Sequence, residues 1–171
     1  QLKPTALRGV PQLQSLHVGH CSLKTPEGIE ALTDLKELSL YSVSGLCDLD
    51  FLSGLTTLRE LTIEDIKGVT VIPNLAALSQ LEEVRIKGLA HMEKIDGVFA
   101  APCLKRLSVG RLPKIQPEAL QPALEHPSLE LVYPALDGMA GSARDEEAAE
   151  LLRPRFGDVF NLDRWNAQRT R

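Results

Sequence analysis

Aliphatic residues recur along the chain at a nearly constant spacing. Alignment on Leu13, Leu35, Leu58, Leu81 and Leu104 gives successive spacings of 22, 23, 23 and 23 residues. Each of these leucines opens a frame L-x-x-L-x-L, and all fifteen frame positions are aliphatic. A blurred sixth copy begins at Leu129, 25 residues further on. Self-similarity with this period predicts stacked units that share one continuous core.

The two halves of each repeat differ in their hydrophobic period. Leu16 and Val18 are two residues apart, as in a strand with one buried face. Ile29, Leu32 and Leu35 are three apart, the spacing of a helical turn. We therefore expect a helical or 3₁₀ return segment after each strand, and several returns open with proline, which suits a first helical turn. The prolines are Pro26, Pro73 and Pro117, and the expected strands lie at about residues 15–18, 37–40, 60–63, 83–86 and 106–109.

Successive strands should run in the same direction, one repeat apart, with every crossover on one side. This predicts an α/β solenoid with one parallel sheet. Because the strand side is narrow and the return side is wider, the sheet should be curved and form the concave face, with the returns on the convex face.

The repeated frame resembles the leucine-rich-repeat superfamily over about residues 2–136. The most familiar form of that family carries Asn eight residues after the first Leu, where its side chain caps backbone groups. Here these positions hold Cys21, Val43, Ile66, Leu89 and Leu112. The chain therefore resembles an irregular type that lacks the Asn ladder, similar to repeats of plant intracellular immune receptors, F-box-associated repeats and bacterial or protozoan proteins. Without the ladder, the backbone groups of each turn need other partners.

We expect two regions, with five to six repeats in residues 1–136, the first of them partial. Leu7 and Val10 fit the return half of an earlier repeat, so upstream repeats are expected; alternatively, residues 1–10 form a short cap. Residues 137–171 are expected to form a C-terminal cap or tail with one helix.

The expected C-terminal helix spans residues 143–152. Ser142 is a suitable N-cap, acidic residues follow in the first turn, and Pro154 is expected to end the helix. The next segment, Phe156 to Trp165, holds half of the Phe residues and the only Trp of the chain. This segment either covers the last repeat or docks elsewhere.

Composition narrows the classes of function. About one residue in six is Leu, and the net charge of −4 argues against a nucleic-acid partner. No apolar run is long enough for a membrane span. Three cysteines do not form a disulfide framework, so a cytoplasmic, reducing location is expected unless an upstream signal peptide has been removed.

No catalytic or metal-binding arrangement is predicted. His17, His20 and Cys21 form H-x-x-H-C, but the frame directs Cys21 inward and His17 to the concave face. No nucleophile–base pair or phosphate-binding loop is present. We therefore expect no metal, no cofactor and no enzymatic activity.

The concave face should carry the side chains that alternate outward on the strands. Glu37, Glu60 and Glu83 should then stack about 4.8 Å apart. Either Lys36, Arg59 and Lys105 screen this column, or the column faces a basic patch on a partner. The candidate partner-binding residues on this face are Tyr41, Glu60, Glu64, Arg85 and Lys87.

These features predict a non-enzymatic protein–protein interaction module, monomeric in isolation, that binds a protein partner through the concave sheet. The alternative is the recognition domain of a larger protein, such as an immune receptor or a ubiquitin-ligase substrate adaptor. A self-assembling scaffold and an enzyme with its site on the tail remain open.

Overall fold

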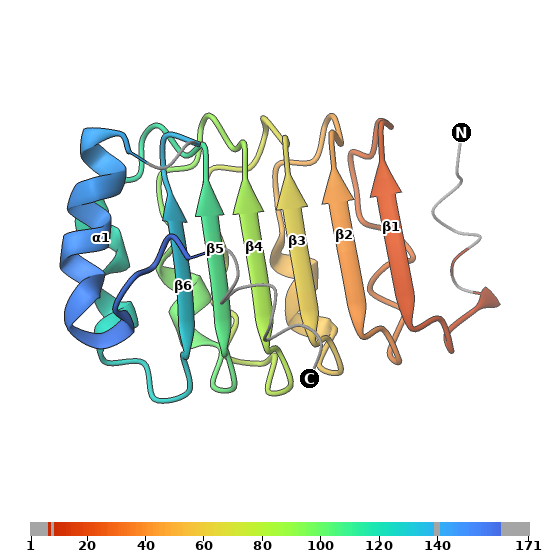
Figure 1. The fold of residues 1–171 in the computed structure, drawn as a ribbon. Coiled ribbons are helices and arrows are strands. Elements are labelled where there is room, and N and C mark those ends of the chain that lie inside the picture. The colour runs from red at the N-terminus through yellow and green to blue at the C-terminus, as the bar shows by residue number, and fades with distance from the viewer. Residues whose placement is uncertain (1–6, 8, 139–140, 162–171) are drawn as a thin grey trace.

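The computed structural model describes residue 7, residues 9–138 and residues 141–161. Within these residues the strands form one parallel six-stranded sheet in chain order (Figure 1). The strands are β1 (Ser15–Gly19), β2 (Glu37–Tyr41), β3 (Glu60–Glu64), β4 (Glu83–Lys87), β5 (Arg106–Gly110) and β6 (Leu131–Ala135). The five expected strands are confirmed, and the blurred sixth copy of the frame forms β6.

The register of the sheet follows the repeat frame. Leu16 lies beside Leu38, and Leu38 lies beside Leu61. The same step continues through Val84 and Leu107. From β2 to β5 these inward side chains are almost fully buried in one continuous core, whereas Leu16 at the β1 edge is only partly buried. The chain is therefore an α/β leucine-rich-repeat solenoid, as predicted.

The return segments lie behind the sheet in Figure 1 and turn with a period of three residues. The amide of Leu52 bonds to the carbonyl of Leu49, and Leu55 bonds to Leu52 in the same way, at 3.0 and 2.9 Å. A 3₁₀ turn has three residues, so each third side chain points inward. The 3₁₀ helices are η2 (Asp50–Gly54), η3 (Asp96–Ala100) and η4 (Pro117–Leu124).

Not every return contains a helix, which corrects the sequence prediction. The returns that begin at Pro26 and Pro73 consist of isolated turns and irregular chain. In the first of them, the amide of Ile29 bonds to the carbonyl of Pro26 at 2.9 Å. Single turns of this kind already direct every third residue inward, so burial of the leucines does not require a continuous helix.

Backbone groups replace the missing Asn ladder. The residue after each of the first five strands has a positive φ, between 50° and 70°. Its amide donates to a carbonyl of the next strand, as from Ser42 to Glu64 at 2.9 Å and from Asp65 to Lys87 at 3.0 Å. The residues at this position are His20, Ser42, Asp65, Gly88 and Arg111. The left-handed backbone thus extends the ladder of the sheet by one bond per repeat.

Pro134 lies in β6, the last strand, which has one edge paired with β5 and one edge unpaired. Leu131 donates to the carbonyl of Lys105, and Ala135 accepts from Arg111, so these residues face β5. Backbone groups alternate in direction along a strand, so Pro134 faces away from β5. A residue without an N–H is tolerated at such an edge, where no further strand needs to pair.

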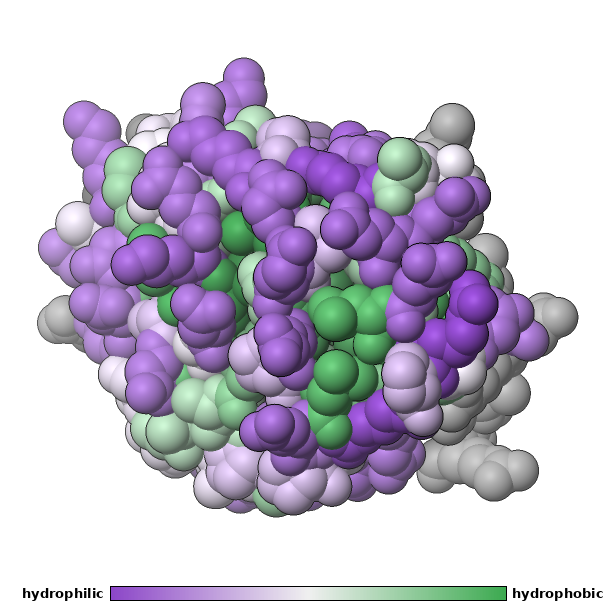
Figure 2. All heavy atoms as spheres, turned by 90° about the vertical axis from the view of Figure 1, so that its left-hand side faces the viewer, coloured by the Kyte–Doolittle hydropathy of each residue, from purple (hydrophilic) through white to green (hydrophobic). Residues whose placement is uncertain are grey.

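Helix α1 (Ala143–Phe156) packs beside β6 and η4 and caps this end of the solenoid (Figure 1). The Ser142 hydroxyl accepts from the amide of Asp145 at 3.1 Å, as expected for an N-cap. Figure 2 shows mostly hydrophilic side chains at this end, with a smaller apolar area between them. A terminal unit of a solenoid needs such a polar outer surface to stay soluble.

The helix continues past Pro154, so the expectation that this proline ends it was wrong. Phe156 is buried, and Gly157, with φ of 69°, terminates the helix by donating to the carbonyl of Arg153. The Arg155 guanidinium donates to the carbonyls of Ala123, Leu124, His126 and Leu129. These contacts hold the last turn despite the cost of an internal proline. In the described part of the chain, no helix has the length and apolarity needed to cross a bilayer.

Candidate functional site

The side of the sheet opposite the return segments is the face that was predicted to be concave, and we call it the open face. Its side chains occupy the first, third and fifth positions of each strand. The five predicted binding residues all lie on it, on three neighbouring strands. Register places Tyr41 beside Glu64, Glu64 beside Lys87, and Glu60 beside Glu83.

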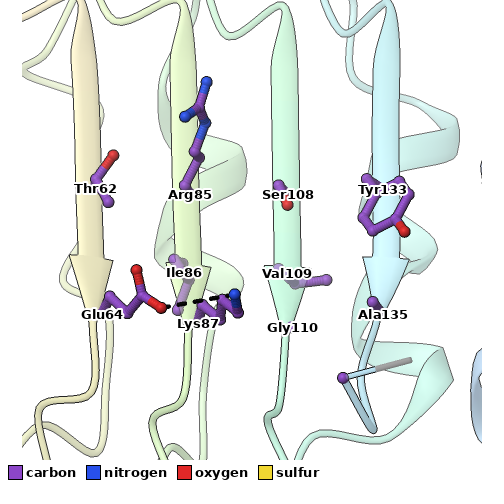
Figure 3. Close-up of a pocket in the computed structure, with 11 residues that line it drawn as sticks. Thr62, Glu64, Arg85, Ile86, Lys87, Ser108, Val109, Gly110, Tyr133 and Ala135 are labelled. Atoms are coloured by element: carbon purple, nitrogen blue, oxygen red, sulfur yellow. Dashed lines mark ion pairs between the residues drawn. The ribbon is translucent and has the colours of Figure 1, made fainter. Parts of the chain in front are cut away.

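A hollow of about 400 Å³ lies on this face over β3 to β6 (Figure 3). Glu64, Arg85 and Lys87 line it, together with Ser108 and Tyr133. The small residues of β5 and β6 leave the space open, because Gly110 and Ala135 add little or no side chain between Lys87 and Tyr133. The hollow therefore offers charged, hydroxyl and aromatic groups within one depression.

Sequence reasoning missed Tyr133, although the signal was present. Tyr133 lies four residues after Leu129, as Arg85 lies four after Leu81. The frame of the sixth repeat is less regular than the other five, so its outward positions were not assigned. Glu60 and Tyr41 do not line the hollow and occupy other parts of the open face.

Exposed ion pairs surround the hollow. Lys87 Nζ lies 3.6 Å from Glu64 Oε1, the pair marked in Figure 3. Arg111 Nη2 lies 3.4 Å from the same Glu64 oxygen and 2.9 Å from Asp65 Oδ1. Exposed pairs of this type contribute about 0–1 kcal/mol each. These groups can therefore exchange their partners for those of a bound ligand at little cost.

The predicted column of glutamates is present, but its members differ in exposure and in hydrogen-bond partners. Glu37 lies beside Glu60, and Glu60 beside Glu83. Glu83 is only 2% exposed and bonds to Arg85 and, at 2.7 Å, to Arg106 Nε. Glu37 is exposed and Glu60 is half-buried. The acidic part of the face is therefore limited to β2 and β3.

Lys36 and Lys105, two of the three residues expected to screen this column, pair with groups outside it, and screening by Arg59 stays a prediction. Lys36 Nζ donates to Gln14 Oε1 at 3.0 Å. Lys105 Nζ lies 3.3 Å from Glu82 Oε1. Each lysine lies one residue before the first outward position of its strand, and its side chain points away from the column. Screening at β4 comes instead from Arg85 and Arg106, which point outward on the open face.

Tyr41 is an exposed aromatic group at the β1–β2 end of the face. Its ring lies over Gly19, where a Cβ atom would overlap it. The His20 ring packs edge-on against it, with centroids 4.9 Å apart. Tyr41 nevertheless remains 38% exposed. Tyrosine is one of the residue types enriched in interface hot spots.

The segment after α1 turns toward the open face. Val159 is buried, and the Phe160 ring packs edge-on against Tyr133, with centroids 5.8 Å apart. The first part of the Phe156 to Trp165 segment thus covers the last repeat. Residues 162–165 of that segment lie outside the described residues.

The H-x-x-H-C motif is not assembled into one site. His17 Nε2 lies 3.3 Å from Ser15 Oγ on the open face, while Cys21 packs against the core. Among the described residues, no three His, Cys, Asp or Glu side chains gather as a metal site requires.

Outside the open face, Lys114 lowers the pKa of the exposed Glu93 carboxyl, through a hydrogen bond and through its positive charge.

No protein-family model matches the chain, and no curated protein matches it. Among solved structures, the tropomodulin C-terminal domain of Caenorhabditis elegans aligns over 99% of this chain and 99% of its own, at 15% identity and a TM-score of 0.43. An internalin of Listeria monocytogenes aligns over 77% of this chain and 50% of its own, at 16% identity and a TM-score of 0.32. The solenoid is evident from the register and the continuous core of this chain itself.

Proposed function

We propose that this chain is a non-enzymatic protein-interaction module that binds a protein partner through the open face of its sheet. The observation that supports this most is the arrangement of side chains across β2 to β6. These side chains are the exposed Tyr41, the half-buried Glu60 and Glu64, and Arg85 and Lys87 in the hollow. All of them lie on neighbouring strands of one regular surface. Such a surface combines hot-spot residue types with charges that set specificity and association rate.

An alanine scan of the open face tests this proposal. A partner is first captured from the native source and its affinity for the intact chain is measured. We expect Tyr41→Ala and Arg85→Ala each to weaken binding by about tenfold or more, since they are hot-spot types. Glu60→Ala, Glu64→Ala and Lys87→Ala should act mainly through the association rate and its salt dependence.

Exposed residues of the return segments provide matched controls. Glu27→Ala and Glu118→Ala remove the same charge from the opposite side of the molecule. Circular dichroism checks that each variant is folded, which matters most for Arg85 because Glu83 bonds to it. If all five open-face variants bind as the intact chain does, the open face is not the binding surface.

A second candidate is the recognition domain of a larger protein, such as an immune receptor or a ubiquitin-ligase substrate adaptor. The partial burial of Leu13 and Leu16 favours it, because the matching residues of the next four repeats are fully buried. A further repeat packed on β1 would complete their burial. The full-length reading frame tests this candidate, which fails if no additional repeat or domain precedes β1.

A further inference from the structure

The open face carries opposite charges on two neighbouring pairs of strands. On β2 and β3 its charged side chains are all carboxylates, and we call these strands the acidic part. On β4 and β5 one carboxylate lies among three cationic groups, and we call these strands the basic part. The charged residues are Glu37, Glu60 and Glu64 in the acidic part, and Glu83, Arg85, Lys87 and Arg106 in the basic part. A bound partner therefore meets a different charge at each end of the face.

Lys87 is the most accessible cation of the basic part. The Arg85 and Arg106 guanidinium groups share the buried Glu83 carboxylate, whereas the Lys87 side chain is 54% exposed. Its Nζ lies 3.6 Å from Glu64 Oε1. This separation is longer than the roughly 2.7–3.2 Å of an N–H···O hydrogen bond, and an ammonium group has three donors. Lys87 can therefore donate to an oxygen of a bound ligand.

The hollow lies directly beside this ammonium group. Gly110 leaves its space open, since a Cβ atom there would lie 3.6 Å from Lys87 Cγ and 3.4 Å from the carbonyl oxygen of Ala135. Ser108 and Tyr133 line the same space (Figure 3). A serine hydroxyl both donates and accepts hydrogen bonds. An oxygen-bearing group in the hollow would thus meet a cation and a hydroxyl donor.

The charge of the hollow favours a carboxylate as its occupant. The charged residues that line it are Glu64, Arg85 and Lys87, which leaves one positive charge in excess. A carboxylate carries one negative charge and balances that excess. A phosphate group carries about −1.5 to −2 at pH 7, which would leave negative charge beside Glu64. The hollow therefore matches the side chain of an acidic residue.

The acidic part lies within reach of the same ligand. Glu60 is at the first position of β3, and Gly110 is at the fifth position of β5. Two strand spacings of about 4.8 Å across the sheet and four residues along a strand give a diagonal of about 16 Å. About five residues of extended chain cover that distance.

We propose that the open face binds an extended segment of a protein partner that carries an acidic and a basic side chain about five residues apart. The acidic side chain lies in the hollow against Lys87 and Ser108, and the basic side chain lies against Glu37 and Glu60. The two charges fix the direction in which the segment crosses the sheet. This proposal rests on the proposed function and adds to it the chemistry of the partner.

Two synthetic peptides of identical composition test the charge pattern in an NMR titration of the isotope-labelled chain. Both contain one Arg and one Glu in a Gly-Ser background, five positions apart in the first peptide and adjacent in the second. The first peptide should shift the amide resonances of Glu60, Lys87, Ser108 and Gly110. It should also bind about two- to fivefold more tightly than the second, because only spaced charges can form both ion pairs.

Two variants test the hollow itself. Gly110→Val fills the space without removing a charge, and Lys87→Met removes the cation. Each should weaken binding of the first peptide by about two- to fivefold. Lys114→Met is the matched control, because Lys114 is similarly exposed and pairs with Glu93 outside the open face. It should leave peptide binding unchanged.

No binding of the first peptide, or equal binding of both peptides, would overturn the proposal. Binding that is unchanged in Gly110→Val and Lys87→Met would also overturn it, because the peptide would then bind elsewhere. Tighter binding of a first peptide with phosphoserine in place of Glu would assign the hollow to a phosphate and exclude the carboxylate. The alanine scan with a captured partner remains a separate test. Loss of that partner in the scan, together with failure of the peptides, would reject the charge pattern and keep the open face as the binding surface.

Discussion

At the scale of single residues, the neighbours on adjacent strands determine whether an outward side chain is buried in ion pairs or left exposed. Glu60 and Glu83 occupy the same position in their repeats and lie side by side. Glu83 is buried between Arg85 and Arg106, and removing one partner of a buried pair costs about 3–5 kcal/mol. Glu60 is half-buried, with no arginine opposite it in the register on either side. The same residue type is therefore held in buried ion pairs on β4 and left half-exposed on β3.

Gly19 should control the position of Tyr41. A Cβ atom at Gly19 would overlap the tyrosine ring, so Gly19→Ala should displace the ring from β1 and separate it from His20. The loss of this aromatic contact should cost about 0.5–1.5 kcal/mol of unfolding free energy. Proton NMR measures the displacement as the loss of the nuclear Overhauser contact between the two rings.

Gly54→Ala is the matched control, because nothing lies within 4 Å of a Cβ atom at that glycine. It should leave the contact between His20 and Tyr41 intact. If Gly19→Ala also leaves that contact intact, Gly19 does not determine where Tyr41 lies.

The sequence predicted which residues face outward but not their individual roles. Alternation along a strand and a constant repeat length fix the face and the register, and these two rules place Glu37, Glu60 and Glu83 in one column. The burial of Glu83 depends on the side-chain conformations of two arginines, one of them on the next rung. Neither rule contains that information, so the pairing of Glu83 with Arg85 and Arg106 could not be predicted.

At the scale of elements, tertiary contacts override local preferences at the C-terminal helix. Pro154 predicted a helix end because proline removes a backbone donor and clashes with the preceding turn. The helix nevertheless extends to Phe156, whose side chain is buried against the last repeat. The sequence could not predict this, since the compensating contacts of Arg155 are made with residues about 30 positions earlier.

Arg155→Met should therefore loosen the cap. The substitution keeps an apolar stem but removes the hydrogen bonds to the carbonyls of Ala123, Leu124, His126 and Leu129. We expect a loss of about 1.5–3 kcal/mol in unfolding free energy, as is typical for hydrogen bonds to a charged group. Denaturant unfolding measures the loss, and hydrogen exchange should be faster in α1 and η4.

Arg153 offers the comparison within the same helical turn, because it is exposed as Arg155 is but makes none of the four carbonyl contacts of Arg155. Arg153→Met should change the unfolding free energy by less than about 0.5 kcal/mol, as surface substitutions commonly do. Equal losses in the two variants would contradict the role assigned to Arg155.

At the scale of the whole molecule, stability should depend on position along the stack. Each rung contacts only its neighbours, so the solenoid behaves as a one-dimensional array of interfaces. Leu61 on β3 is buried between Leu38 and Val84, whereas Leu16 on β1 is partly buried and is paired on one side by Leu38. Leu61→Ala should cost about 2–5 kcal/mol, because the cavity weakens two interfaces. Leu16→Ala should cost about 1 kcal/mol, nearer the mean for point substitutions. Urea unfolding of both variants measures the difference, and equal costs would mean that the rungs do not stack as one continuous core.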